Sequence, residues 1–323
     1  MTLPVDPDLV APDDHGGLVP APAAPSGRAG AAGGEAETGL SRSKLVLRRF
    51  RRRKVSMAAL GVIAGLFVIA FVGPYLSKWD YSGQDYNAFL EPPSSTHWFG
   101  TTQIGQDVFE RTMRGLQKSL FIGLLTAFLS TGTAAVVGAS AGYFGGWVER
   151  ILMWIVDLLL VLPAFLIIAI VSPTFRDSSW LFFVVLLAAF SWMITARIVR
   201  GLTLSLRERE FITAARYMGV PSRVIIFRHL LPNMSSFLII DATITVGGAI
   251  LAESGLSYFG FGIQPPDVSL GTLIAAGGPS AFTYPWLFLF SGGLLILTVL
   301  AVSVVGDGLR DAFDPYSESA KAR

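Results

Sequence analysis

Few residues in this chain could carry out chemistry. Its 323 residues include no cysteine and only three histidines, His15, His97 and His229, which lie far apart. Disulfides, thiolate metal sites and cysteine nucleophiles are therefore excluded, and the histidines lack the spacing of a zinc site. No Gly-x-x-x-x-Gly-Lys-Ser/Thr motif occurs, so this chain does not hold a nucleotide phosphate in that way. We expect neither an enzyme nor a metal site.

Two carboxylates stand inside long apolar stretches of the sequence. Asp157 and Asp241 each lie roughly eight residues from the predicted cytoplasmic end of their stretch, which corresponds to a depth of about 12 Å in a helix. A carboxylate at that depth is costly and by default indicates a functional site. Two interpretations stay open: the side chains line a translocation pathway, or they bond neighbouring helices. An intramembrane enzyme would need further groups at this depth, and His97 and His229 are predicted on opposite sides of the membrane.

The composition indicates that lipid surrounds the elements that carry these carboxylates. Hydrophobic residues make up 52% of the chain and charged residues 15%, whereas a soluble domain carries about a quarter charged residues. A helix needs roughly 20 apolar residues to cross the hydrocarbon. We therefore predict an all-α protein of the plasma (inner) membrane with several spans. The six predicted spans are residues 57–76, 119–141, 150–171, 180–200, 234–256 and 286–306.

Basic residues predict the orientation. The run Arg48–Lys54 directly precedes the first span, so the positive-inside rule places the N-terminus in the cytoplasm, and six spans return the C-terminus there. A nucleic-acid-binding patch is the weaker alternative, because such a patch would not adjoin a span. The predicted cytoplasmic segments contain Arg150, Arg197, Arg200, Arg207, Arg209, Arg216, Arg223, Arg228, Arg310, Lys321 and Arg323, and the external ones contain Lys78, Arg111, Arg114, Lys118 and Arg176.

These assignments divide the chain into segments. Residues 1–41 are rich in Pro, Gly and Ala and contain no aromatic residue, so we expect a disordered cytoplasmic tail. A cleaved signal peptide is the alternative, but the apolar stretch is too long and lies too deep in the chain. The other predicted segments are a basic anchor with the first span at 42–76, an external segment at 77–118, a core with five spans at 119–316 that includes a cytoplasmic loop at 207–233, and a cytoplasmic tail at 317–323.

The loop at 207–233 is predicted to form a helix, a break and a second helix. Good helix formers at 208–218 begin with acidic residues, which the helix dipole favours there. Gly219 suits the left-handed conformation that ends a helix, and Pro221 suits the first turn of the next one. We expect Pro232 to end that second helix and Asn233 to cap the fifth span.

A small pair, Ala214 and Ala215, lies within the first helix of this loop. Small side chains would let that helix press into a groove of another protein, with the surrounding arginines pairing with acidic residues at the rim. An ordinary amphipathic surface helix accounts for the pattern equally well. The residues alone leave both interpretations open.

The loop resembles a known motif. The segment Thr213-Ala-Ala…Gly219…Leu231-Pro232 is similar to the EAA loop of binding-protein-dependent ABC importers, including the spacing of thirteen between glycine and proline. The leading Glu of the family is Thr213 here, with Glu210 nearby, and His229 replaces a usual aliphatic residue. The resemblance implies that an ATPase subunit docks on Glu210, Thr213, Ala214, Ala215, Arg216, Gly219, Pro221 and Pro232.

Three further stretches resemble the peptide permeases of these importers. They are His97–Val108, in which Gln106 replaces a usual Arg, Glu253–Pro266, and Gly306–Pro315. The likeness covers about residues 45–316 and implies the type I ABC importer permease fold, in a C-type subunit of an oligopeptide or dipeptide importer. Candidate contacts to the external segment or to a binding protein are Asp107, Glu253, Gln264 and Pro265.

The resemblance also implies partners. Two ATPase domains, on one chain or two, would bind ATP and Mg, and this chain would carry no cofactor. A second, B-type permease subunit and an external peptide-binding protein would complete the importer. Relatives that carry nickel chelates or glutathione keep those substrates open as alternatives. A secondary transporter is a further alternative, but the chain shows no convincing internal repeat.

Overall fold

The computed structural model describes residues 42–175 and 179–313. The predicted tails at 1–41 and 317–323, and with them Lys321 and Arg323, lie outside the described residues, as does Arg176. Within the described ranges the chain forms helices and no strand, apart from one isolated bridge between Thr101 and Asp107. The predicted all-α class is confirmed.

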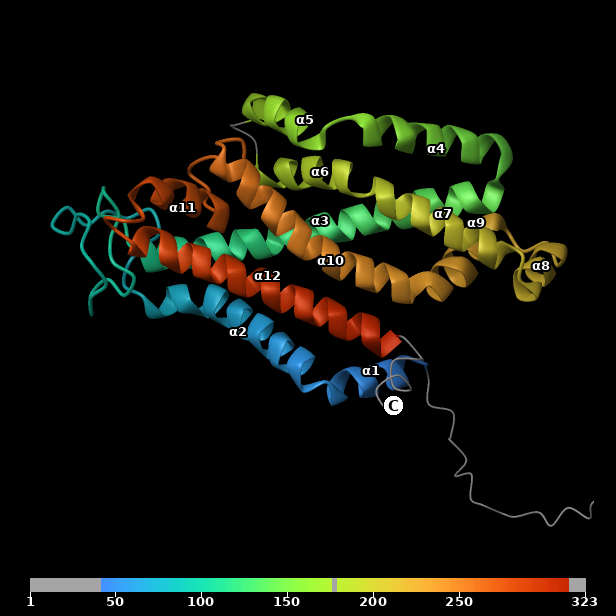
Figure 1. Ribbon diagram of the computed structural model, residues 1–323, viewed down its shortest axis with the longest axis horizontal. Helices are drawn as coiled ribbons and strands as arrows, with labels where there is room; N and C mark the ends of the chain where they lie inside the picture. The colour runs from blue at the N-terminus through green and yellow to red at the C-terminus, as the bar shows by residue number, and fades with distance from the viewer. Residues whose placement is uncertain (1–41, 176–178, 314–323) are drawn as a thin grey trace, which may run out of the picture. The chain divides into compact units, whose positions relative to one another are not determined.

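Twelve α-helices make up most of the described chain (Figure 1). They are α1 (Arg42–Arg52), α2 (Lys54–Leu76), α3 (Val108–Phe144), α4 (Gly146–Val161), α5 (Ala164–Val171), α6 (Trp180–Ser191), α7 (Met193–Arg207), α8 (Glu210–Tyr217), α9 (Ser222–Val224), α10 (Leu231–Tyr258), α11 (Leu270–Gly277) and α12 (Trp286–Phe313). Two 3-10 helices, η1 (Ser172–Phe175) and η3 (Gly278–Ser280), and one π-helix, η2 (Ile225–Leu230), accompany them.

The described helices provide up to six membrane spans. Four are long and apolar enough to cross on their own: α2, α3, the continuous run from α9 through η2 to α10, and α12. Two bent pairs bring the number to six, α4 with α5 at 77° and α6 with α7 at 48°. Pro163 lies in the break between α4 and α5, where its ring and missing N–H prevent a continuous helix.

Helix α3 begins eleven residues before the predicted start of the second span, so the segment between α2 and α3 is 77–107 rather than 77–118. Asp107 is its N-cap, and the Asp107 Oδ1 atom accepts a hydrogen bond from the Glu110 backbone N–H at 2.9 Å. Charged residues in the first three turns hid this start from a search for apolar stretches. Their side chains fit here because Glu110 and Lys118 are buried against other parts of the chain.

Helix α3 packs against α7 and α10, while α12 packs against α10 and α2. Small residues allow the α3–α7 contact: a Cβ atom on Gly138 would lie 2.4 Å from the Ala196 carbonyl oxygen, and one on Gly142 would lie 2.7 Å from the Thr203 Cβ atom. The small residues of α3 therefore allow its backbone to lie close to α7. Gly132, on the same helix, has nothing within 4 Å of a built Cβ atom.

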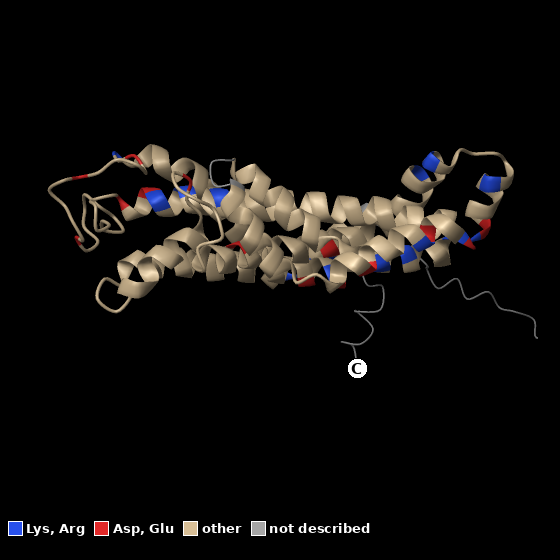
Figure 2. Ribbon diagram, turned by 90° about the horizontal axis from the view of Figure 1, so that it is seen from above, with Lys and Arg blue, Asp and Glu red and all other residues tan. Residues whose placement is uncertain are grey.

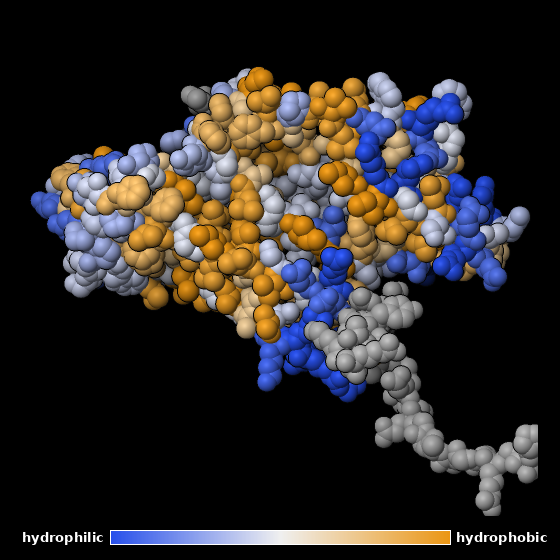
Figure 3. Space-filling view, in the orientation of Figure 1, coloured by the Kyte–Doolittle hydropathy of each residue, from blue (hydrophilic) through white to orange (hydrophobic). Residues whose placement is uncertain are grey.

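Apolar side chains cover much of the outer surface. Figure 3 shows a broad hydrophobic area over the middle of the helices and hydrophilic residues around α1 and α8. Acidic and basic residues gather mainly towards the ends of the long helices (Figure 2). Exposed Val68, Phe128, Ile170 and Leu300 belong to the apolar surface, which is the distribution expected of helices that face hydrocarbon.

Candidate functional site

Helix α8 is a short, defined helix that ends as the sequence predicts. Gly219 has φ +74°, its N–H donates to the Arg216 carbonyl at 3.1 Å, and the Val220 N–H donates to the Ala215 carbonyl at 3.1 Å. These two bonds form a Schellman motif, which requires the left-handed residue that glycine supplies most easily. The predicted break is therefore confirmed.

The second half of the loop differs from the prediction. Pro221 precedes α9 as its N-cap, one residue before the predicted position. Pro232 does not end a helix, because α9, η2 and α10 run without interruption from Ser222 to Tyr258. Asn233 does not cap the fifth span either, since its side-chain Nδ2 donates to the His229 carbonyl at 2.6 Å.

The π-helix η2 lies just before this proline. The Leu231 N–H donates to the Ile226 carbonyl, a bond that spans five residues instead of four. The wider turn places Pro232 in the first turn of α10. A proline is tolerated best at this position, where its missing N–H costs the fewest backbone hydrogen bonds. A single π turn in this way carries the helix past a residue that normally stops one.

One face of α8 is buried against its own chain. Ile212 is 1% exposed and Ala215 is 4% exposed, and both belong to a cluster that includes Ile225, Ile226 and Leu230. The spacing of three places Ile212 and Ala215 on the same side of the helix. Ala215 is therefore buried within its own chain in this structure, and its role in docking stays a prediction.

The opposite face of α8 is exposed and rich in large side chains. Phe211, Tyr217 and Met218 are 46%, 88% and 75% exposed, which sequence reasoning did not single out. The predicted contact residues on the exposed surface of this loop are Glu210, Thr213, Ala214, Arg216, Gly219, Pro221 and Pro232. Exposed aromatic and Met residues beside small ones are typical of a protein interface.

A second contact ties the start of the loop to α3. The Arg207 guanidinium donates to the carbonyl oxygens of Gly142, at 3.1 Å, and Tyr143, at 3.5 Å. These carbonyls belong to the last turn of α3, where the helix dipole favours a cation. The loop is thus attached to both α3 and α10.

Asp241 joins three helices. Its carboxylate accepts hydrogen bonds from Thr131 Oγ1 at 2.8 Å and Thr195 Oγ1 at 2.7 Å. The three residues lie on α10, α3 and α7 respectively. This geometry supports the helix-bonding interpretation of Asp241, while a role in the pathway stays a prediction.

Asp157 is paired as well. Its Oδ1 atom accepts from Arg197 Nε at 3.1 Å, and Glu149 lies in a parallel ion pair with Arg200, so both pairs connect α4 to α7. The spacing of three between Arg197 and Arg200 was the available signal for this ladder. A surface hollow lined by these residues keeps Asp157 more than half exposed, so its role as pathway lining stays a prediction.

Glu253 is fully buried and bonds the segment that follows α10. Its Oε1 atom accepts from the Ser257 and Ser269 hydroxyls, both at 2.6 Å. Ser269 is the N-cap of α11, in a capping box with Thr272. Glu253 is therefore bonded to the segment that follows α10, and its contact with a binding protein stays a prediction.

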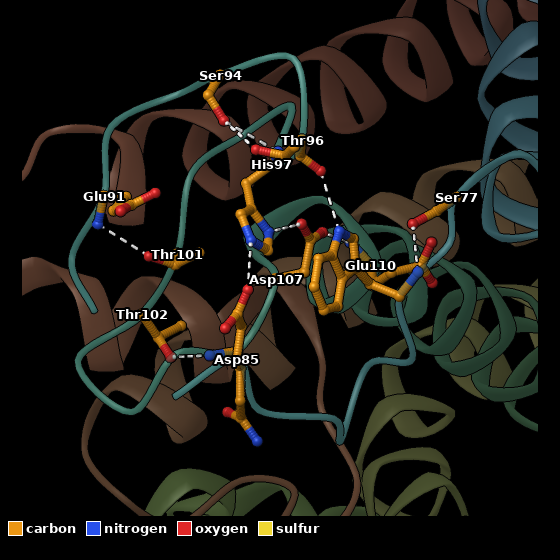
Figure 4. A network of polar contacts seen from close by, with 12 residues as sticks. Ser77, Asp85, Glu91, Ser94, Thr96, His97, Thr101, Thr102, Asp107 and Glu110 are labelled. Atoms are coloured by element: carbon orange, nitrogen blue, oxygen red, sulfur yellow. Dashed lines mark hydrogen bonds and ion pairs between the residues drawn. The ribbon is translucent and has the colours of Figure 1, made fainter. Parts of the chain in front are cut away.

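The other external candidates divide into buried and exposed residues. Asp107 is 3% exposed and bonds His97 Nδ1 at 2.8 Å, with Asp85 on the other side of the imidazole (Figure 4). Gln264 donates to the carbonyls of Gly260 and Gly262 and shapes its own turn. Asp107 is thus bonded within its own chain, and only Pro265 among these candidates is exposed, so their contact with a binding protein stays a prediction.

Comparison with known proteins places these features in a family. Residues 134–317, more than half of the chain, match the family described as binding-protein-dependent transport system inner membrane component. The chain belongs to this family. Residues 41–93 of the permease also match the N-terminal TM domain of oligopeptide transport permease C, as the resemblance in the sequence predicted. It is therefore a multi-pass protein of the inner membrane and a C-type permease subunit.

Named relatives are similar over nearly their whole length. The permease is 56% identical over 282 residues to the oligopeptide transport system permease protein OppC of Mycobacterium tuberculosis (strain ATCC 25618 / H37Rv), covering 87% of this chain and 97% of the relative. It is 36% identical over 276 residues to the protein of the same name from Bacillus subtilis (strain 168), covering 85% and 90%. A putative peptide permease protein of Brucella suis biovar 1 is 38% identical over 272 residues, covering 84% and 90%.

Proposed function

We propose that this permease moves oligopeptides or dipeptides from an external binding protein into the cytoplasm, driven by ATP that partner subunits hydrolyse. The relatives named as oligopeptide permeases support the substrate class. The partners would be two ATPase domains that bind ATP and Mg, a second permease subunit and a peptide-binding protein. Both chain ends and the loop at 207–233 would then lie in the cytoplasm.

The observation that carries this proposal is the two-sided character of α8. Its exposed face offers Phe211, Tyr217 and Met218 around the small Ala214. Its buried face, with Ile212, packs on the base of α10. A helix of this kind receives a partner on one side and passes the displacement to a membrane span on the other.

The cycle follows from these contacts. Closure of the ATPase dimer on ATP moves the groove that holds α8. The buried face of α8 transmits the movement to η2 and α10, and Arg207 transmits it to the end of α3. ATP binding therefore shifts the equilibrium between two arrangements of the spans, because the contacts at α8 and Arg207 differ between them.

Ala214 offers a sharp test of docking, because it is exposed, whereas Ala215 is buried. We expect Ala214→Glu to insert normally, to lose co-purification with the ATPase, and to lose ATP-driven uptake of labelled peptide in proteoliposomes. Ala214→Ser keeps a small side chain and is the matched control, with near-normal values for both. Normal ATPase binding and uptake by Ala214→Glu would rule out docking at this face.

The substrate is tested in the same vesicles. We expect uptake of labelled di- or oligopeptides when the binding protein and ATP are both present. Uptake of a nickel chelate or glutathione, with peptides inactive, would reassign the substrate within the same fold. Peptide uptake driven by a proton gradient without the ATPase subunits would instead indicate a secondary transporter.

A further inference from the structure

A cavity of about 190 Å³ lies where the N-terminal end of α3 meets α11 and α12. Its polar lining includes Gln106, Arg111 and Ser291, and its apolar lining includes Leu273 and Leu287. None of these residues lies in the loop at 207–233, and none is one of the carboxylate residues described above. The cavity has room for a small group rather than for a whole peptide.

Three polar atoms of this lining have no hydrogen-bond partner among the described residues. They are Arg111 Nε, Gln106 Oε1 and Ser291 Oγ. Ser291 is 1% exposed, so its hydroxyl has almost no contact with bulk solvent. Buried polar groups are nearly always bonded, and three exceptions around one space indicate that the space is occupied by a polar group.

The neighbouring cations of α3 show that Arg111 is unusual. Arg114 donates to Gln117 at 3.1 Å, and Lys118 forms an ion pair with Asp267 at 2.9 Å. Arg111 has no such partner in the part of the chain that the structure describes. The adjacent Glu110 does not pair with Arg111 among the described residues, and its own Oε1 atom is also buried without a hydrogen-bond partner.

The chemistry of the lining selects an anion. A guanidinium offers a planar set of N–H donors that matches a carboxylate, and the Ser291 hydroxyl adds another donor. The amide of Gln106 donates as well when its nitrogen is turned inward, because the two orientations of an amide group have the same shape. Water alone would satisfy the hydroxyl and the amide but would leave the half-buried charge without a counter-ion.

We propose that this cavity binds a single carboxylate group, held by Arg111 and Ser291 with Gln106 beside them. The apolar lining, Leu273 and Leu287, accommodates a short hydrocarbon substituent. Two sources share this chemistry: the C-terminal carboxylate of a peptide and a free small carboxylate such as acetate. Only the first source depends on the proposed function.

Acetate is the probe for the site itself. The full chain in lipid nanodiscs is titrated with acetate, and saturation transfer to the acetate methyl protons is measured by NMR. We expect saturable transfer in the unaltered chain and a loss of about tenfold or more in affinity for Arg111→Gln, since a hydrogen bond to a charged group is removed. Arg114→Gln removes the same charge from the same helix and is the matched control, with unchanged affinity.

Ser291→Ala keeps the cation and tests the hydroxyl, so the proposal stays testable even where Arg111→Gln does not fold. We expect a weaker but measurable loss of acetate binding in that variant. No saturable transfer in the unaltered chain, or equal affinity in all variants, overturns the proposal. A structure of the assembled importer with a partner subunit's carboxylate on Arg111 overturns it too.

Competition identifies the source of the carboxylate. A tripeptide with a free C-terminus and the same tripeptide with a C-terminal amide are each added to the acetate-loaded chain. Displacement by the free acid alone assigns the site to the peptide terminus, and displacement by neither assigns it to small free carboxylates. Neither result changes the outcome of the uptake assays. A failure of the carboxylate site can therefore be distinguished from a failure of the proposed peptide transport.

Discussion

Single carboxylates hold separate helices of this permease together. Glu253 accepts hydrogen bonds from a hydroxyl of its own helix and from the N-cap hydroxyl of α11. Asp241 accepts hydrogen bonds from hydroxyls of α3 and α7. Each acceptor therefore satisfies two donors that would otherwise be left without a partner. Removal of the acceptor costs more than one hydrogen bond, because both donors lose their partner at once.

Glu253 provides the cleanest test at this scale. We expect Glu253→Ala to lower stability by about 1–3 kcal/mol, since it leaves the Ser257 and Ser269 hydroxyls buried without an acceptor. Glu253→Gln keeps an oxygen at the same position and costs less. Thermal unfolding of the purified protein in detergent measures both, and equal shifts for the two variants would contradict this account of the network.

At the scale of elements, the α3–α7 contact depends on the absence of a side chain at one position. We expect Gly138→Ala to destabilise the protein by about 1–3 kcal/mol, because its Cβ atom meets the Ala196 carbonyl and the Val199 side chain. Gly132→Ala, on the same helix with open space around it, is the control and is neutral or slightly stabilising. Thermal unfolding compares the pair, and a similar loss in both would mean that helix propensity, not contact, decides.

The end of α8 provides a second test. Gly219 has φ +74° and no atom within 4 Å of a built Cβ atom, so backbone conformation alone limits the residue there. We expect Gly219→Val to cost about 1–2 kcal/mol and Gly219→Asn clearly less, since Asn tolerates the left-handed region. Unfolding midpoints of the two variants measure the difference, and a Val variant as stable as the Asn variant would show that the turn does not need this conformation.

At the scale of the whole molecule, the predicted orientation is open to direct measurement. The sequence contains no cysteine, so single cysteines label one position each. Ser95, in the segment between α2 and α3, and Ala214, on α8, are both exposed. We expect a membrane-impermeant maleimide to label Ser95→Cys on spheroplasts with an intact plasma membrane. Ala214→Cys is labelled only after that membrane is permeabilised. The reverse pattern would invert the topology.

The sequence predicts the parts of this fold that depend on local chemistry. Gly219 and the six apolar stretches are examples, since a left-handed turn and a hydrophobic span each have a short-range signature. Pro232 shows the limit, because the π-helix η2 just before it decides whether this proline stops the helix. Ala215 shows another, since only the packing of Ile225 and Ile226 reveals that its methyl group faces inward.

The candidate sites were predictable to a similar degree. Asp157, Asp241 and Glu253 stand out as charges in apolar sequence, but their partners on other helices lie 16 to 110 residues away. The hydroxyls of Thr131, Thr195 and Ser269 carry no signal of their own, because such residues are common in membrane helices. Only the tertiary structure shows which hydroxyl residues bond the carboxylates, since residue type does not distinguish them.

The uninterrupted helix from Ser222 to Tyr258 has a mechanical consequence. Its 37 residues give a rod of about 55 Å at 1.5 Å per residue. Its N-terminal end packs against α8, and its C-terminal end contains Glu253, which bonds the N-cap of α11. A tilt of about 5° at one end displaces the other by about 5 Å over that length. In the proposed transport cycle, this helix acts as a lever that joins α8 to the opposite side of the membrane.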